Sequence, residues 1–324
     1  MIDLVKELKD IKSVGISGHI RPDGDCVGST MAVYLYIKKN MPDIDAHIYL
    51  DSPPPVFECI KDIDKVEDPK AGKDIVFDAF IMIDTVKDRS GDAEALYDKA
   101  KKRINIDHHI TNPGTDSDVS FIVPTASSAA ELVFECFDEK LMDTEIAKAI
   151  YIGMVHDTGV FQYSNVSPKT LNYAAKLIGY GFDFSTIIAE TFYEKTYLQS
   201  QILGRVLSES ILVMDGKVSV GHIDQKMAKF YNSHPFDYDG IVNALKQIKG
   251  VDVAIFMHEL PDHKYKVSLR TTDAIDASEV CSYFGGGGHK KAAGVIMEGN
   301  FYDVVNNLTA RIEKQYAERT DQRI

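Results

Sequence analysis

The first half of the chain alternates short apolar runs with helical patterns, and this alternation restricts the fold more than any other feature. The strand-like runs, rich in Ile, Val and Phe, occupy residues 13–19, 45–51, 78–84, 102–107 and 120–124. Helical patterns lie between or after them, at residues 27–40, 128–141 and 143–157. Strands that alternate with helices are typical of a doubly wound, largely parallel sheet. Ser128 followed by Glu131 also fits a capping box at the start of its helix.

The second half follows a different pattern. The stretch ILVMDGKVSVGHI contains two apolar runs around Asp215-Gly216, which is a strong hairpin signal. VDVAIFMHELPDHKYKVSLRT predicts a second pair of strands joined by a Pro-Asp turn. We therefore expect an α/β protein with a doubly wound, mainly parallel N-terminal domain at 1–185, a helical linker at 186–210, and a smaller C-terminal α/β domain with a mixed sheet at 211–324. We expect an active-site cleft between the two domains.

Composition excludes several classes of protein. The formal net charge of −13 argues against tracking along long duplex nucleic acid, because phosphate neutralisation supplies most of that affinity. The four cysteines form no CxxC pair, which argues against a disulfide framework or a thiolate zinc site. The start, MIDLVKELKDIKS, predicts an amphipathic helix and not a signal peptide, and no stretch approaches the ~18 apolar residues of a membrane span. We expect a cytoplasmic protein that does not enter a membrane.

Four clusters of Asp and His stand out in the first domain, within the stretches GHIRPDGDCVGS, IMIDTVKDR, INIDHH and GMVHDTGVFQY. Three of them lie at or just beyond predicted strand ends, where open α/β sheets collect ligands, and the fourth must reach that edge from a loop after a helix. Carboxylates and imidazoles without thiolates suit Mn²⁺ or Mg²⁺. Six such ligands are about right for two ions that share a bridging carboxylate. The candidate ligands are His19, Asp23, Asp25, Asp84, His108 and Asp157.

Three of the four clusters also have a purely structural interpretation. RPDGD is a favourable turn, Asp84 alone could be a helix N-cap, and the His pair could be buried and hydrogen-bonded. The coincidence of four such stretches in one predicted domain favours the metal site.

In the second domain, FGGGGHKKAAGV is the informative stretch. Its glycines let the backbone approach a ligand closely, and consecutive N–H groups can form an anion-binding nest. HKKAAG can start a helix whose N-terminus favours an anion. In KVSLRT, strand alternation puts Ser268 and Arg270 on one face, where Arg270 could clamp a phosphate or simply be solvated.

Together these stretches resemble the DHH phosphoesterase family, named for the triplet found here at Asp107-His108-His109. GGGHKKAAG, at 286–294, resembles the signature of the GGGH-type DHH-associated domain. The resemblance implies that His19, Asp23 and Asp84 bind one metal ion. It also implies that Asp25, Asp84, His108 and Asp157 bind the other. It makes His109 an electrostatic stabiliser or proton donor at the scissile phosphate, with Asp107 fixing the tautomer of a histidine that binds a metal ion. The far end of the substrate would contact Arg270, Gly286, Gly287, Gly288 and His289.

Within this family, a compact two-domain chain resembles the nanoRNase and pAp-phosphatase group. That group hydrolyses very short RNA oligonucleotides, dinucleotides and 3′-phosphoadenosine 5′-phosphate (pAp). The implied cofactors are two divalent ions, manganese first and magnesium as the alternative. A soluble phosphodiesterase dedicated to linear or cyclic dinucleotides would carry the same motifs, and a non-catalytic nucleotide-binding module would have lost some of them. The sequence leaves open the preferred substrate and base, the physiological metal, and whether the chain forms a homodimer.

Overall fold

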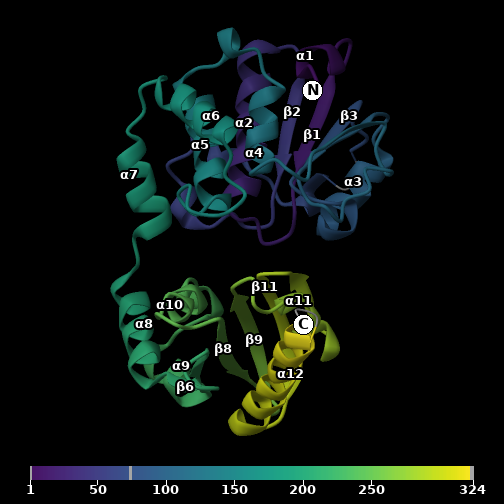
Figure 1. Ribbon diagram of the computed structural model, residues 1–324. Helices are drawn as coiled ribbons and strands as arrows, with labels where there is room; N and C mark the ends of the chain where they lie inside the picture. Colours follow the sequence, from purple (N-terminus) through teal and green to yellow (C-terminus); the bar gives the residue numbers. More distant parts are fainter. Residues whose placement is uncertain (1, 73–74, 322–324) are drawn as a thin grey trace. The chain divides into compact units, whose positions relative to one another are not determined.

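The computed structural model describes residues 2–72 and 75–321, and the chain divides into two compact units, Met1–Glu194 and Lys195–Ile324 (Figure 1). No helix within the described residues is both long enough and apolar enough to span a bilayer. The four cysteines are free thiols, and Cys26, Cys136 and Cys281 are buried.

The first unit contains a five-stranded parallel sheet of order β2-β1-β3-β4-β5. Its strands are β1 (Ser13–Ser17), β2 (Asp45–Tyr49), β3 (Ala79–Ile83), β4 (Arg103–Asp107) and β5 (Val119–Ile122). The central strand β3 is buried throughout, as parallel strands covered on both faces usually are. The doubly wound parallel domain is therefore confirmed.

The α-helices of this unit are α1 (Leu4–Glu7), α2 (Gly24–Asn40), α3 (Glu94–Lys99), α4 (Ala129–Glu135), α5 (Thr144–Asp157), α6 (Pro168–Ile178) and α7 (Phe184–Ile188), with a π-helical turn at Ala189–Tyr193. Short 3-10 turns lie at Pro55–Phe57, Ile63–Lys65, Pro69–Gly72, Lys87–Arg89, Gly91–Ala93 and Glu139–Leu141. The predicted amphipathic first helix is much shorter than expected. The capping box is only half formed, because Ser128 accepts the Glu131 N–H while the Glu131 carboxylate accepts from Ser127.

Helices α2 and α5 approach each other closely at two glycines. A Cβ on Gly28 of α2 would lie 2.5 Å from the Ala149 carbonyl oxygen of α5, and one on Gly153 of α5 would lie 3.0 Å from Asp25 Oδ1 of α2. Close approach of this kind requires residues without side chains. The packing matters for the site because α2 begins, and α5 ends, with acidic residues of the predicted metal centre.

The second unit contains a six-stranded mixed sheet of order β10-β11-β9-β8-β7-β6, in which only β7 and β8 are parallel. Its strands are β6 (Ile211–Val213), β7 (Val218–Ile223), β8 (Val253–Leu260), β9 (Lys264–Thr271), β10 (Gly287–His289) and β11 (Ala292–Glu298). Both predicted strand pairs, β6–β7 and β8–β9, are confirmed.

Helices cover the two faces of this sheet unequally. They are α8 (Tyr197–Glu209), α9 (Gln225–Tyr231), α10 (Ile241–Lys246), α11 (Ala277–Tyr283) and α12 (Phe301–Asp321), with a 3-10 turn at Pro235–Tyr238. Residues of α11 and α12 share one core with β7, β8, β9 and β11. Residues of α8 and α10 form a separate core against the opposite face, mainly at β8 (Figure 1).

One expectation for this unit is wrong. HKKAAG does not start a helix, because it forms the turn of the β10–β11 hairpin and the beginning of β11. Ala293, Val295 and Met297 alternate toward the core, and β11 pairs along its whole length with β9. This pairing satisfies the backbone N–H and C=O groups of the segment, which would otherwise have had to bond within a helix.

Candidate metal centre

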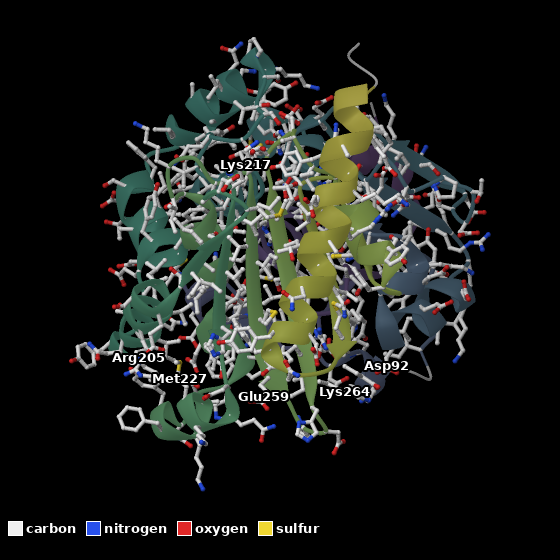
Figure 2. The ribbon with its side chains drawn as sticks, turned by 60° about the horizontal axis from the view of Figure 1, so that its bottom comes forward. Asp92, Arg205, Lys217, Met227, Glu259 and Lys264 are labelled. Atoms are coloured by element: carbon white, nitrogen blue, oxygen red, sulfur yellow. The ribbon has the colours of Figure 1, made fainter. Side chains whose placement is uncertain are left out.

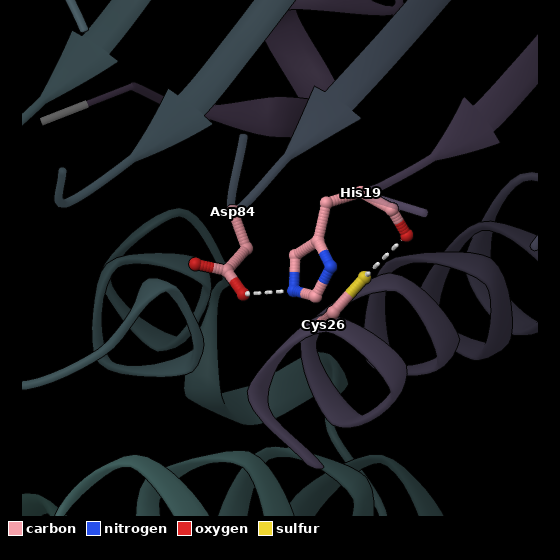
Figure 3. Close-up of side chains that lie close together, drawn as sticks. All are labelled: His19, Cys26 and Asp84. Atoms are coloured by element: carbon pink, nitrogen blue, oxygen red, sulfur yellow. Dashed lines mark hydrogen bonds and ion pairs between the residues drawn. The ribbon is translucent and has the colours of Figure 1, made fainter. Parts of the chain in front are cut away.

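Three neighbouring strands bring the first predicted ligands together. His19 follows β1, Asp84 follows β3 and His108 follows β4, and because the strands are parallel their carboxyl ends meet at one edge of the sheet. His19 Nε2 lies 3.5 Å from Asp84 Oδ2, and His108 Nε2 lies 3.4 Å from Asp84 Oδ1. Figure 3 shows the His19 ring directed at the Asp84 carboxylate.

Asp84 is the centre of this arrangement. Only 3% of the residue is exposed, and its backbone has φ of 59°, a left-handed conformation that Asp and Asn adopt more readily than other non-glycine residues. Among the described residues, no hydrogen bond reaches the buried Oδ1. A buried carboxylate oxygen without a donor is costly unless a cation approaches it. The donor set around Asp84 therefore fits a bound divalent ion.

Asp25 and Asp157 reach the same place from helices. Asp25 lies in the first turn of α2, and its oxygens accept the backbone N–H groups of Ala129 (2.7 Å) and Ala130 (2.9 Å) at the start of α4. His108 Nε2 lies 3.8 Å from Asp25 Oδ2 and 3.7 Å from Asp157 Oδ2. Asp157 is the last residue of α5, so it reaches the edge from the helix and not from a loop as expected.

Asp23 serves the local fold as well. It is the N-cap of α2, where its Oδ1 accepts the N–H groups of Asp25 and Cys26. The same Oδ1 lies 3.7 Å from His19 Nε2. RPDGD therefore does not form a separate turn, because α2 begins at Gly24 with Asp23 as its cap, and Asp23 also lies beside the cluster.

Asp107 and His109 form a second layer beside Asp84. Asp107 is fully buried, and its Oδ1 contacts His109 Nδ1 at 2.7 Å while also accepting the backbone N–H groups of His108 and His109. His109 Nδ1 lies 3.6 Å from Asp84 Oδ1. Asp107 therefore orients the ring of His109 and not, as expected, that of a histidine predicted to bind a metal ion, because His108 contacts Asp107 through its backbone N–H.

Asn112 and Asn105 were not predicted as site residues. The Asn112 amide donates to Asp107 Oδ2 at 2.6 Å and to Asn105 Oδ1 at 2.7 Å. The Asn105 amide donates to the Met82 and Thr85 carbonyls, on either side of Asp84. The only sequence signal is their position in INIDHHITN, on either side of the DHH triplet.

The carboxylates of the cluster favour positive charge at this site, as the pKa values of its side chains indicate. Burial lowers the pKa of His19, but Asp23 and Asp84 outweigh it and raise that pKa to about 10. Burial likewise lowers the pKa of His108, and Asp84, Asp25 and Asp157 raise it to about 10. Burial raises the pKa of Asp157 to about 7, although His108 opposes this rise. Without a cation, the negative charge of the neighbouring carboxylates therefore keeps the His19 and His108 rings protonated at neutral pH.

Three overlapping groups of side chains have ligand atoms within 4.8 Å of one another among the described residues. They are His19, Cys26 and Asp84; Asp84, His108 and His109; and Asp25, His108 and Asp157. Burial and nearby carboxylates raise the pKa of the Cys26 thiol far above its usual value, so the thiolate that metals bind is disfavoured. Asp23 is in none of these groups.

The predicted substrate-binding residues lie together in the second unit. Gly287, Gly288 and His289 form β10, and Gly286 directly precedes it. A Cβ on Gly286 would lie 2.3 Å from the Gly294 carbonyl oxygen, and Gly288 has φ of 144°, so both positions require glycine. Arg270 pairs with Ala292, and Ala292 pairs with His289. Ser268 and Arg270 share the partly exposed face of β9, as predicted.

The comparisons with known proteins agree with this architecture. The N-terminal domain of the DHH family matches residues 13–154, and the DHHA1 domain matches residues 224–318. A Thermus thermophilus protein named bifunctional oligoribonuclease and PAP phosphatase NrnA is 27% identical over 290 residues, covering 88% of this chain and 84% of that protein. A Bacillus subtilis protein of the same name is 25% identical, covering 96% of this chain and 97% of that protein.

The crystal structure of an exopolyphosphatase-related protein from Bacteroides fragilis has the same fold. Its TM-score is 0.89 at 22% identity, and the match covers 97% of this chain and 95% of that one. Two family domains in the expected order, with the DHH triplet at the end of β4, identify the chain as a member of the DHH family of phosphoesterases.

Proposed function

We propose that the chain hydrolyses the 3′-O–P bond of very short oligonucleotides to release 5′-mononucleotides, and the same bond of pAp to give AMP and phosphate. The observation that carries this proposal is the buried Asp84 carboxylate, which lies within 3.6 Å of ring nitrogens from His19, His108 and His109. The names of the Thermus and Bacillus relatives support the choice of substrates.

The cofactors we infer are two divalent ions, manganese first and magnesium as the alternative. His19, Asp23 and Asp84 would hold one ion, while Asp25, Asp84, His108 and Asp157 would hold the other, with Asp84 shared. Bound divalent cations supply charge neutralisation of a phosphate and lower the pKa of water.

Side chains of the protein complete the chemistry. The contact with Asp107 raises the pKa of His109 and so favours the protonated ring. We assign His109 as the group that stabilises the scissile phosphate and donates a proton to the leaving 3′ oxygen. Asp107 orients the His109 ring. Arg270, the Gly286–Gly288 backbone and His289 would bind the remainder of the substrate through charge and N–H groups.

One site can serve both substrates because the bond that breaks is the same. In RNA the 3′-phosphate carries another nucleoside, and in pAp it is terminal. The second unit would then bind the part of each substrate that lies away from the scissile 3′-phosphate.

A product profile tests the proposal. Purified protein with Mn²⁺ is incubated with pAp, di- to pentanucleotides, a cyclic dinucleotide and a long single strand, and the products are separated by ion-pair chromatography. We expect mononucleotides from the short substrates, AMP from pAp, and slow turnover of the long strand. Hydrolysis of dinucleotides alone would favour the dedicated phosphodiesterase, and faster turnover of the long strand would reject length selection.

The Asp84→Asn variant is the control for a shared site. Asn tolerates the left-handed backbone of residue 84 and removes only the charge. Both activities should be lost together, and retention of either one would contradict a single shared site.

A further inference from the structure

One face of β9 carries a row of polar side chains beyond the predicted substrate-binding residues. Lys266, Ser268 and Arg270 alternate with Val267 and Leu269, and the latter two are buried against α11 and α12. Lys266 is exposed, while Ser268 and Arg270 are partly buried. The three polar residues therefore point to the same side of the sheet.

Helix α10 packs near β9 on this face, so Lys266 is the exposed residue of the row and Ser268 and Arg270 are partly covered. On β11 the residues opposite Lys266, Ser268 and Arg270 are Ile296, Gly294 and Ala292, of which two are small and none is charged. On β8 the partners are His258, Phe256 and Ala254. Helices α8 and α10 form their core against Ala254 and Phe256, on the β8 side of the row.

The charge of the row contrasts with that of the chain. The protein has a formal net charge of −13, yet no strand partner of Lys266, Ser268 or Arg270 is acidic. The carboxyl group of Asp239 interacts with the charge of Lys266, and burial raises the pKa of Asp239. Lys264, the next residue on this face, is paired with Glu298 at 3.2 Å. Figure 2 labels Lys264 at the start of β9.

Spacing along the strand relates the row to substrate length. Alternate residues of an extended strand are about 6.8 Å apart, so Lys266 lies roughly 14 Å along β9 from Arg270. Arg270 lies at the end of β9 that pairs beside the β10–β11 hairpin. A compound as short as pAp that is held at Arg270 would not extend to Lys266.

We propose that Lys266 and Ser268 extend the Arg270 site into a track that binds the phosphates and sugar hydroxyls of oligonucleotides longer than a dinucleotide. This inference depends on the proposed function, because it assigns a specificity for substrate length to the same enzyme. Lys266 supplies the charge for a phosphate, and Ser268 supplies a hydrogen-bond donor between the two cations.

The test compares Lys266→Ala with Lys229→Ala, which removes the same charge from the exposed helix α9. For each variant, kcat/KM is measured for a pentanucleotide and for pAp. In Lys266→Ala the ratio of pentanucleotide to pAp activity should fall about fivefold, which is the effect of losing one favourable exposed charge contact. Lys266→Arg should restore the ratio, and Lys229→Ala should leave it unchanged.

Binding of a fluorescent pentanucleotide is measured in parallel on an Asp84→Asn background. The slope of log affinity against log salt should decrease by about 0.7 when Lys266 is replaced, as expected for one lost contact to single-stranded phosphate. If the wild type cleaves neither substrate, the proposed function fails. The binding measurement then still tests whether Lys266 contacts a phosphate of the oligonucleotide. Equal loss with pAp and pentanucleotide, or an unchanged ratio and salt slope, would overturn the inference.

Discussion

At the scale of single residues, the sequence identified the candidate ligands by their chemistry but not the residues that hold them in place. His19, Asp84 and His108 could be predicted because Asp and His at several strand ends are rarely coincidental in one domain. Asn105 and Asn112 could not, because no sequence pattern distinguishes an asparagine whose amide holds a neighbouring loop or carboxylate from any other asparagine. The left-handed backbone of Asp84 could not be predicted either, because the residue is not a glycine.

Replacing Asn112 with Ala should lower kcat by about 10- to 100-fold, the usual effect of removing a partner that orients a catalytic group. The amide holds Asp107, and Asp107 in turn holds the His109 ring. KM should change little, and the imidazole ¹⁵N shifts of His109 should report a mixture of tautomers. Asn40→Ala is the matched control, because the Asn40 amide also bonds backbone carbonyls, those of Tyr36 and Leu141. A stability loss without changes in kcat or ¹⁵N shifts would contradict this role.

Manganese affinity should increase as pH rises. His19 and His108 have pKa values of about 10, and that of Asp157 is about 7. All three must lose protons to become ligands, so binding releases protons and weakens as pH falls. Calorimetric titration in buffers of different ionisation enthalpy should give at least one proton released per ion near neutral pH. His47→Gln should behave as the wild type, because His47 is paired with Glu67 at 2.7 Å and belongs to none of the metal-binding groups. Affinity independent of pH would contradict the assignment.

At the scale of elements, periodicity predicted most strands and helices, and it failed where tertiary pairing decided the outcome. The HKKAAG segment has helix-forming residues, but the alternation of Ala293, Val295 and Met297 and the pairing with β9 make it a strand. The first helix is short because, among the described residues of its segment, only Leu4 and Leu8 are buried, so little tertiary packing stabilises a longer helix. Helix packing could not be predicted, although Gly28 and Gly153 allow α2 and α5 to bring Asp25 and Asp157 to the sheet edge.

Gly153→Ala should weaken this arrangement. The new Cβ would lie 2.6 Å from the Ala130 Cβ and 3.0 Å from Asp25 Oδ1, so the helices or the carboxylate must move. Overpacking of this kind costs about 1–3 kcal/mol of unfolding free energy, and we expect metal affinity and kcat/KM to fall as well. Gly204→Ala in α8 is the control, because a Cβ added there would meet no described atom within 4 Å and alanine favours a helix interior by up to ~1 kcal/mol. Urea unfolding and Mn²⁺ titration measure both, and equal stabilisation of the two variants would contradict the account.

At the scale of the whole molecule, the sequence predicted two α/β units with one parallel and one mixed sheet, and the structure has both. The strand signals were sufficient because each unit buries its own core around its own sheet. For the proposed metal centre, the sequence predicted that the strand ends meet at one edge of the sheet but not the distances between the side chains. The distances around Asp84 depend on helix packing and on the two asparagines, which leave no periodic signal in the sequence.

The central claim is that side chains just beyond β1, β3 and β4, at the start of α2 and at the end of α5 gather around two divalent ions that share Asp84. Crystals of the full chain grown with Mn²⁺ and measured at the manganese absorption edge test it most directly. We predict two anomalous peaks about 3.5–4 Å apart, both within coordination distance of the Asp84 carboxylate. The absence of any peak beside Asp84 in the manganese-loaded crystals would contradict the claim.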